Sequence, residues 1–361
     1  MVKRRKKIKK SGILFILIIV FIIGFFLFNK KDDKPSNKTI SIMKENNIDE
    51  KYYSKTLEYV LLNGIYDEKY LNEYKDIEFN NEDNFESILT TFLPKGYKGK
   101  EINYILKLSD KNIDILKSKD YKDISNYYQY KNFDASKIER YNDYKTLSDE
   151  SYQNVITMVN INIDLPYYSD TKMVENADDV LVLVNKYNYL PKGYKPSDLD
   201  YLDGAYGNKV PIRKIIKESF LALQESAKNE INITLMPTTA FREENFQETL
   251  YNNYVKSYGK SDADTFSARP GYSEHQTGLA IDLKNIAIKG NVRLTDENYD
   301  WLENNAYKYG FVVRFPENKE NITGYQFENW HIRYVGKENA KIMYEEKLCL
   351  EEYIDLYIKN Y

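Results

Sequence analysis

The strongest constraint on this chain is an uncharged apolar run at residues 12–28, which follows a strongly basic N-terminal segment. The run is close to the minimum of about 17 residues that a membrane-spanning helix needs. Basic residues stay on the cytoplasmic side, so residues 1–11 are predicted to be a cytoplasmic tail and the chain after Lys30 to face outward. Because no small-x-small cleavage pattern follows the run, we expect an uncleaved signal anchor in a single-pass protein of the cell membrane.

The rest of the 361 residues is long enough for two folded regions. Residues 29–40 are polar, contain Pro35 and have no apolar periodicity, which predicts a linker. Residues 41–151 carry apolar side chains at helical spacing, for example Leu57 and Leu61, so we expect a small helical region. The pattern gives this region no recognisable function, because amphipathic stripes in helical arrays are usually core.

The charge distribution and the single cysteine argue against a nucleic-acid-binding protein and against a fold held by internal disulfides. The 52 lysines and arginines and 55 aspartates and glutamates give a net charge of −3 and are well mixed after the basic start. Nothing in this distribution indicates a nucleic-acid partner. The only cysteine, Cys349, cannot form an intramolecular disulfide, and its apolar neighbours favour a small core residue.

After about residue 170 the pattern changes to mixed helix and strand. Helical rhythm occurs at residues 210–227 and again from Phe241 onward. Strands are predicted at residues 180–184, 231–236, 279–283, 311–315 and 330–335. The sequence therefore predicts an α+β domain at residues 175–361 with a mostly antiparallel sheet.

The chain has only two histidines, His275 and His331, and both lie among other residues typical of metal sites. His275 precedes a Gly-broken turn, and Asp282 follows on an alternating strand, so the two side chains can converge. A catalytic zinc site uses three nitrogen or oxygen ligands and keeps one position open, which two imidazoles and one carboxylate can provide. Spacing alone also fits two histidines that are ordinary buried polar residues.

A metal-dependent hydrolase also needs a carboxylate that acts as general base. Glu328 lies three residues before His331 and can be held beside it. Glu274 is the competing candidate because it adjoins His275. We favour Glu328, since successive side chains of an extended segment point to opposite faces.

These residues form a pattern that resembles the metal-binding signature of the VanY-like D-alanyl-D-alanine carboxypeptidases. Its fixed positions here are Ser273, His275, Gly278, Ala280, Asp282, Glu328 and His331. The likeness extends from about residue 184 to residue 353 and excludes the helical region. It implies that His275, Asp282 and His331 bind Zn²⁺ and that Glu328 is the catalytic base.

The resemblance continues upstream with one departure. The family usually carries a Ser-Gly-Tyr-Arg turn with a glutamine five residues after the arginine. Here the turn reads Thr-Ala-Phe-Arg and ends at Arg242, and Gln247 keeps the spacing. The resemblance gives Arg242 the role of holding a substrate carbonyl or carboxylate, which suits a guanidinium fork. Gln247 and Ser273 are expected to contribute to substrate binding.

The predicted reaction is therefore zinc-dependent hydrolysis of the terminal D-alanine of peptidoglycan stem peptides or their precursors, outside the membrane. Three alternatives remain open at this stage. The enzyme could be an L,D-carboxypeptidase or a peptidoglycan endopeptidase of the same fold. The chain could also be a non-catalytic cell-wall-binding protein, although the intact Glu328 argues against this.

Overall fold

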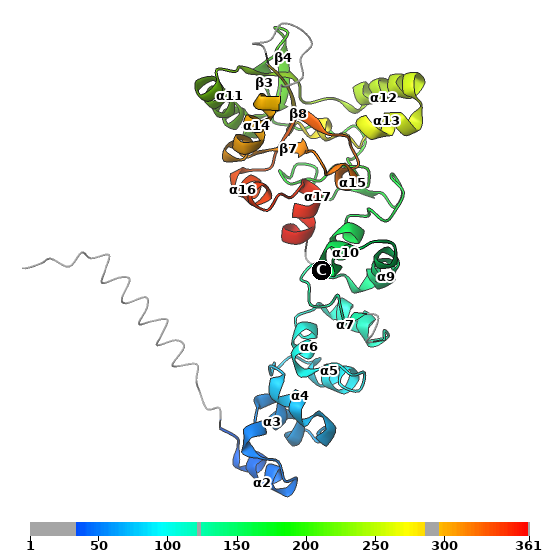
Figure 1. The fold of residues 1–361 in the computed structure, drawn as a ribbon, viewed down its shortest axis with the longest axis vertical. Coiled ribbons are helices and arrows are strands. Elements are labelled where there is room, and N and C mark those ends of the chain that lie inside the picture. The colour runs from blue at the N-terminus through cyan, green and yellow to red at the C-terminus, as the bar shows by residue number, and fades with distance from the viewer. Residues whose placement is uncertain (1–33, 121–123, 286–295, 360–361) are drawn as a thin grey trace, which may run out of the picture. The chain divides into compact units, whose positions relative to one another are not determined.

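A computed structural model describes residues 34–120, 124–285 and 296–359 (Figure 1). The predicted cytoplasmic tail and the anchor at residues 12–28 lie outside these ranges. Among the described residues, no helix is both long and apolar enough to cross a membrane. Contacts divide the chain between Gln129 and Tyr130, and each unit is described by itself.

The described part of the N-terminal unit consists of short helices, several of which begin at a serine. Ser54 and Ser109 accept hydrogen bonds from backbone amides in the first turns of their helices, which satisfies donors that would otherwise lack partners. Buried Leu57, Ile88 and Phe92 provide its core. The helices are α2 Asn37–Glu45, η1 Glu50–Tyr52, α3 Lys55–Leu62, η2 Glu68–Tyr70, α4 Leu71–Asp76, α5 Phe85–Phe92, α6 Gly99–Ile105 and α7 Asp110–Lys117.

One helix that the sequence pattern grouped with the helical region belongs to the C-terminal unit. This is α9 Ile138–Leu147, which follows the short η3 Ala135–Lys137 and precedes α10 Tyr152–Asn160 of the same unit. Met158 and Ile161 form an apolar cluster with Ile322 and Cys349 from the α+β part of the unit. The predicted helical region, residues 41–151, therefore spans both units. Cys349 is buried in this cluster, as its apolar neighbours indicated.

The centre of the C-terminal unit is a four-stranded antiparallel sheet with strand order β5-β6-β8-β7. Its strands are β5 Leu235–Thr239, β6 Ala280–Asn285, β7 Phe311–Phe315 and β8 Glu328–Tyr334. A separate antiparallel hairpin joins β3 Leu199–Asp203 to β4 Lys209–Arg213. The prediction of an α+β fold is confirmed. The expectation of antiparallel pairing needs one correction, because β1 Lys172–Met173 and β2 Asn188–Tyr189 pair in parallel.

Helices pack against this sheet and enclose a continuous apolar core. Phe220 and Leu223 of α11 are buried in the same cluster as Ile281 of β6 and Ile332 of β8. In Figure 1, α12 and α13 lie side by side away from α11. The helices are η4 Lys214–Ile216, α11 Lys217–Ile231, α12 Glu244–Tyr258, α13 Lys260–Phe266, η5 Glu274–Thr277, α14 Asp296–Asn305, η6 Ala306–Tyr309, α15 Glu320–Thr323, α16 Lys337–Glu345, α17 Leu350–Tyr353 and the π-helical turn η7 Ile354–Ile358.

Three predicted elements were wrong in whole or in part. Residues 180–184 are not a strand, because the carbonyls of Val180 and Val182 accept hydrogen bonds from the guanidinium of Arg333. The predicted helix at residues 210–227 begins later, since its first residues pair with β3 as β4. The strand predicted at residues 231–236 begins only at Leu235 of β5.

Candidate active site

Two neighbouring strands and one short turn bring the predicted metal ligands together. Asp282 lies on β6 directly opposite His331 on β8, in the antiparallel register. His275 lies in the 3₁₀ turn η5, which ends at Gly278 with a φ of +67°. A side chain at position 278 would meet the backbone and side chain of Arg213 at 3.0 to 3.3 Å, so this turn requires glycine.

His275, Asp282 and His331 place one donor atom each within 4.8 Å of one another. Asp282 lies between the two imidazoles, with one carboxylate oxygen 3.2 Å from His275 Nε2 and the other 3.2 Å from His331 Nδ1. His275 Nδ1 lies 2.7 Å from the carbonyl oxygen of Ala240, so a hydrogen bond to this carbonyl leaves Nε2 free to bind a metal. Two imidazoles and a carboxylate are the donors that Zn²⁺ takes in catalytic sites.

The charges around these residues also suit a cation. Burial alone would raise the pKa of Asp282, but the two imidazoles hold it well below its usual value. Burial lowers the pKa of His275, whereas nearby carboxylates outweigh burial and raise the pKa of His331 well above its usual value. Asp282 Oδ1 is buried and has no hydrogen-bond partner among the described residues. A metal ion would take the place of the proton on His331 and satisfy this oxygen.

Glu328 stands beside this donor set without belonging to it. It is the first residue of β8, opposite Phe315 across an irregularity in the β7–β8 pairing. Its Oε2 lies 3.4 Å from His331 Nδ1, the nitrogen that faces Asp282. A carboxylate in this position can reach a water molecule held at the donor set, as a general base must.

Arg242 and Gln247 form a fixed pair at the edge of the donor set. Arg242 Nη1 donates to Gln247 Oε1 at 2.7 Å, and Gln247 Nε2 donates to the Ala268 carbonyl at 2.7 Å. Arg242 Nη2 lies 3.8 Å from Asp282 Oδ2. Burial lowers the pKa of Arg242, and its buried Nε has no hydrogen-bond partner among the described residues. This guanidinium is therefore oriented and has a donor left for a ligand.

One pocket of about 530 Å³ contains every residue of the predicted site. Ser273, the residue before η5, lies on its wall and is buried. Sequence reasoning missed the aromatic part of the lining, which includes Tyr254, Tyr258 and Phe266 from α12 and α13. These three rings pack against one another, with centroids 5.1 to 6.3 Å apart. The helical rhythm after Phe241 predicted α12 but could not show which aromatic residues face the pocket.

Glu274 is held differently from what its sequence position suggested. It lies in a 3₁₀ turn, so the argument from alternating faces of an extended segment does not apply to it. Its Oε1 accepts hydrogen bonds from Arg314 Nε at 2.7 Å and Arg333 Nη1 at 2.8 Å. Burial would raise the pKa of Glu274, but the two arginines hold it well below its usual value. Both guanidinium groups therefore bind the same oxygen of Glu274, which makes this carboxylate a poorer candidate for the general base than Glu328.

The fold and the site define the class of protein. An α+β domain gathers two imidazoles and a carboxylate in a pocket, with a second carboxylate and an oriented arginine beside them, and such an arrangement suits a metal-assisted hydrolase. The sequence profile of the VanY family, D-alanyl-D-alanine carboxypeptidase, matches residues 209–337.

Relatives of known sequence agree with this match. The candidate carboxypeptidase YodJ of Bacillus subtilis (strain 168) is 39% identical over 210 residues, which are 54% of this chain and 76% of YodJ. A D-alanyl-D-alanine carboxypeptidase of Enterococcus faecalis (strain ATCC 700802 / V583) is 36% identical, over 48% of this chain and 65% of its own length. The bifunctional VanXYC of Enterococcus gallinarum is 31% identical over 49% of this chain and 94% of its own. The chain therefore belongs to the VanY family of D-alanyl-D-alanine carboxypeptidases.

Among solved structures, the LD-carboxypeptidase LdcB is similar with a TM-score of 0.48 and 36% identity, covering 52% of this chain and 91% of LdcB. A D,D-pentapeptidase VanY from a VanB-type resistance cassette, solved in complex with Zn(II), has a TM-score of 0.43 and 33% identity over 50% of this chain and 99% of its own.

Proposed function

We propose that this chain is a zinc-dependent carboxypeptidase that removes the terminal D-alanine from peptidoglycan stem peptides. One observation carries the proposal: the carboxylate of Glu328 lies 3.4 Å from the ligand nitrogen of His331 but outside the three-donor cluster. A scaffold that had lost its chemistry would not need this arrangement. The D-alanine-terminated substrate is supported by the names of the relatives in Enterococcus faecalis and Enterococcus gallinarum.

The residues of the pocket divide the reaction between them. His275, Asp282 and His331 would hold Zn²⁺, which supplies a Lewis acid that acidifies a water molecule and polarises the scissile carbonyl. Glu328 takes the proton from the attacking water and returns it to the leaving amine. Arg242, fixed by Gln247, donates hydrogen bonds to the substrate carbonyl or its terminal carboxylate. Ser273 lines the same pocket and contributes a hydroxyl to substrate binding.

We further propose that residues 12–28 anchor the chain in the cell membrane and that the pocket faces outward, where wall peptides and their precursors are within reach. The basic residues before the apolar run support this orientation. Amino-terminal sequencing of the mature protein is the test. A mature chain that begins after Phe28 would contradict the anchor.

Defined stem peptides test the proposed activity. The purified, zinc-loaded full chain is incubated with a pentapeptide that ends in D-Ala-D-Ala, a tetrapeptide that ends in a single D-alanine, and a cross-linked dimer, and the products are identified by mass spectrometry. We expect release of one D-alanine from the pentapeptide and none from a Glu328→Gln control. Release only from the tetrapeptide would indicate an L,D-carboxypeptidase, and cleavage of the dimer an endopeptidase. No cleavage of any substrate would leave a binding function.

A further inference from the structure

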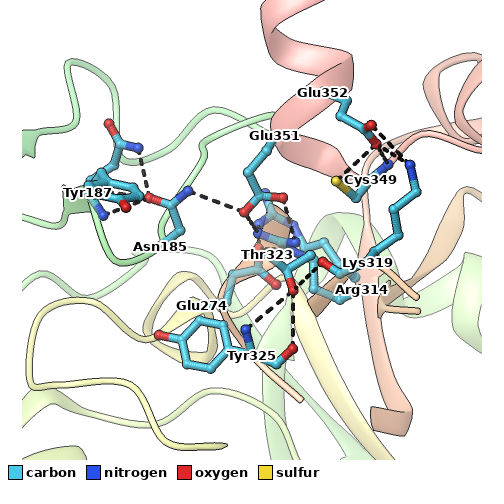
Figure 2. Close-up of polar contacts among 12 residues, drawn as sticks. Asn185, Tyr187, Glu274, Arg314, Lys319, Thr323, Tyr325, Cys349, Glu351 and Glu352 are labelled. Carbon is cyan, nitrogen blue, oxygen red and sulfur yellow. Dashed lines mark hydrogen bonds and ion pairs between the residues drawn. The ribbon is translucent and has the colours of Figure 1, made fainter. Parts of the chain in front are cut away.

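A buried group of four charges lies behind the candidate metal site. Arg314 of β7 and Arg333 of β8 are at most 1% exposed, and Glu274 and Glu351 are at most 5% exposed. Arg314 binds Glu274 with Nε and forks onto Glu351 of α17 with its other two nitrogens, at 2.9 and 2.7 Å (Figure 2). Asn185 donates a further hydrogen bond to Glu351 at 3.2 Å. Two guanidinium groups and two carboxylates make the group electrically neutral, which is what burial requires.

The arginines occupy only one oxygen of Glu274. Its Oε1 accepts from both guanidinium groups, whereas Oε2 has no hydrogen-bond partner among the described residues. Oε2 faces His331 Nε2 at 3.5 Å, and that nitrogen is also buried without a partner in the described part of the chain. A buried donor or acceptor without a partner is costly, so a small rotation of the ring that joins the two is favourable.

We infer that Glu274 is a positioning residue that accepts a hydrogen bond from His331 Nε2–H and thereby leaves His331 Nδ1 to bind the metal. The two histidines would then present different nitrogens. His275 donates Nδ1–H to the Ala240 carbonyl and offers Nε2, and His331 does the opposite. Arg314 and Arg333 both bind Oε1 of Glu274, so Oε2 is the oxygen left to accept a hydrogen bond, and the tautomer of His331 that donates from Nε2 fits this contact.

This inference rests on the proposed zinc site, and wild-type protein tests both. Because the chain has only two histidines, uniform ¹⁵N labelling gives two imidazole signal sets in long-range ¹H–¹⁵N spectra. His331 is assigned through its ring contact with Phe315, whose centroid lies 4.9 Å away. In the zinc-loaded protein we expect metal-bound Nδ1 and protonated Nε2 on His331, with the reverse on His275. Zinc bound through Nε2 of His331 would overturn this inference alone, whereas failure to bind zinc would overturn the proposed function as well.

Matched variants separate positioning from structural support. Glu274→Gln and Glu351→Gln each remove one negative charge from the same buried group and leave the side-chain volume unchanged. Both should lower the melting temperature. Glu274→Gln should also weaken zinc binding by about 10- to 100-fold, as outer-shell partners of metal ligands typically do, while Glu351→Gln should keep a zinc Kd close to wild type. Equal loss of zinc affinity in the two variants would show that the group supports only the fold.

If Glu274→Gln does not fold, Glu274→Asp provides the same test. Aspartate keeps the charge that both arginines need, but it is one methylene shorter and holds the imidazole less well. It should regain most of the stability while its zinc Kd remains above that of wild type. A wild-type zinc Kd in a stable Glu274→Asp protein, with Nδ1 still bound to the metal, would overturn the positioning role.

Discussion

The imidazole of His331 lies between two carboxylates that occupy very different environments. Behind it, Glu274 is enclosed by Arg314 and Arg333 and lies in a charge-neutral core. In front of it, Glu328 lines the pocket and faces no arginine within ion-pair distance among the described residues. The comparison shows that proximity to a ligand does not define a base. A carboxylate saturated by guanidinium groups is a fixed acceptor, whereas one that borders the pocket is open to substrate and solvent.

The largest effect is expected when the imidazole between the two carboxylates, or its partner ligand His275, is removed. His331→Ala and His275→Ala should each abolish stoichiometric zinc binding, since the chain contains no third histidine. Metal analysis of the chelator-washed and zinc-repleted full chain measures this. Full zinc occupancy in both single variants would show that the site lies elsewhere.

Replacing Glu328 or Glu274 by glutamine, one at a time, tests which of the two carboxylates acts as the general base. Glu328→Gln should retain zinc but lose about 10² to 10⁴ in the rate of D-alanine release, the usual contribution of a positioned acid–base group. Glu274→Gln, assayed at saturating zinc, should lose far less. Single-turnover rates on a D-alanine-terminated stem peptide decide between them. Equal losses, or a fully active Glu328→Gln, would show that the base is misassigned even if the zinc site is correct.

A third substitution, at Arg242, tests whether a charged group beside the donor set binds the substrate or supports the metal ligands. Arg242→Lys keeps the positive charge near Asp282. It loses the planar guanidinium, which can donate to Gln247 and to a substrate oxygen at the same time. A charge-assisted hydrogen bond contributes about 1.5 to 3 kcal/mol, so kcat/KM should fall by about 10- to 100-fold. Zinc content, measured on the same samples, should not change. Loss of zinc in this variant would mean that Arg242 supports the ligands and not the substrate.

The smallest expected effect concerns a third carboxylate, Glu58 in the N-terminal unit, which is fixed by neutral donors and one lysine. Burial opposes its charge, but hydrogen bonds from Ser36, Thr39, Lys55 and Tyr53 lower its pKa from 4.5 to about 2. The folded pKa is depressed, so this stabilisation is complete above about pH 4.5 and is lost as the pH falls toward 2. Allowing for partial solvent screening, it amounts to about 1 to 2 kcal/mol.

Hydrogen exchange of the α2 and α3 amides in the full chain, at pH 5 and pH 3, measures this local stability. Glu58→Gln should remove most of the difference between the two pH values. An unchanged pH dependence in the variant would assign the effect to other carboxylates. Tryptophan fluorescence cannot report it, because both tryptophans, Trp301 and Trp330, belong to the C-terminal unit.

The alternation of apolar and polar residues along the sequence predicted the strands that carry part of the site. The strand at residues 311–315 was predicted with correct bounds, and the alternation around Asp282 indicated the strand that carries it. The convergence of His275, Asp282 and His331 followed from the resemblance, and the structure brings their donor atoms within 4.8 Å. The roles of Glu328, Arg242, Gln247 and Ser273 stay predictions.

What the sequence could not provide depends on partners that are distant along the chain. Residues 180–184 have strand-like composition, yet their carbonyls bind Arg333, more than a hundred residues later. The sequence analysis also did not predict that Arg314 and Arg333 are buried, although the composition of one strand indicated it. Arg314 lies on a strand whose other residues are all apolar or aromatic, and a charged residue on such a strand needs a buried partner.

The position of Glu351 in the chain also determines when the site can form. Arg314 and Arg333 are synthesised before Glu351, and until α17 packs they share only the carboxylate of Glu274. An unneutralised guanidinium in a core costs several kcal/mol, so we expect the sheet around Arg314 to gain stability only when α17 is in place. The ring of His331 is supported from the same group. We therefore expect the proposed metal site to form late in folding, and a nascent chain that lacks α17 should hold zinc poorly even though every proposed ligand has already been made.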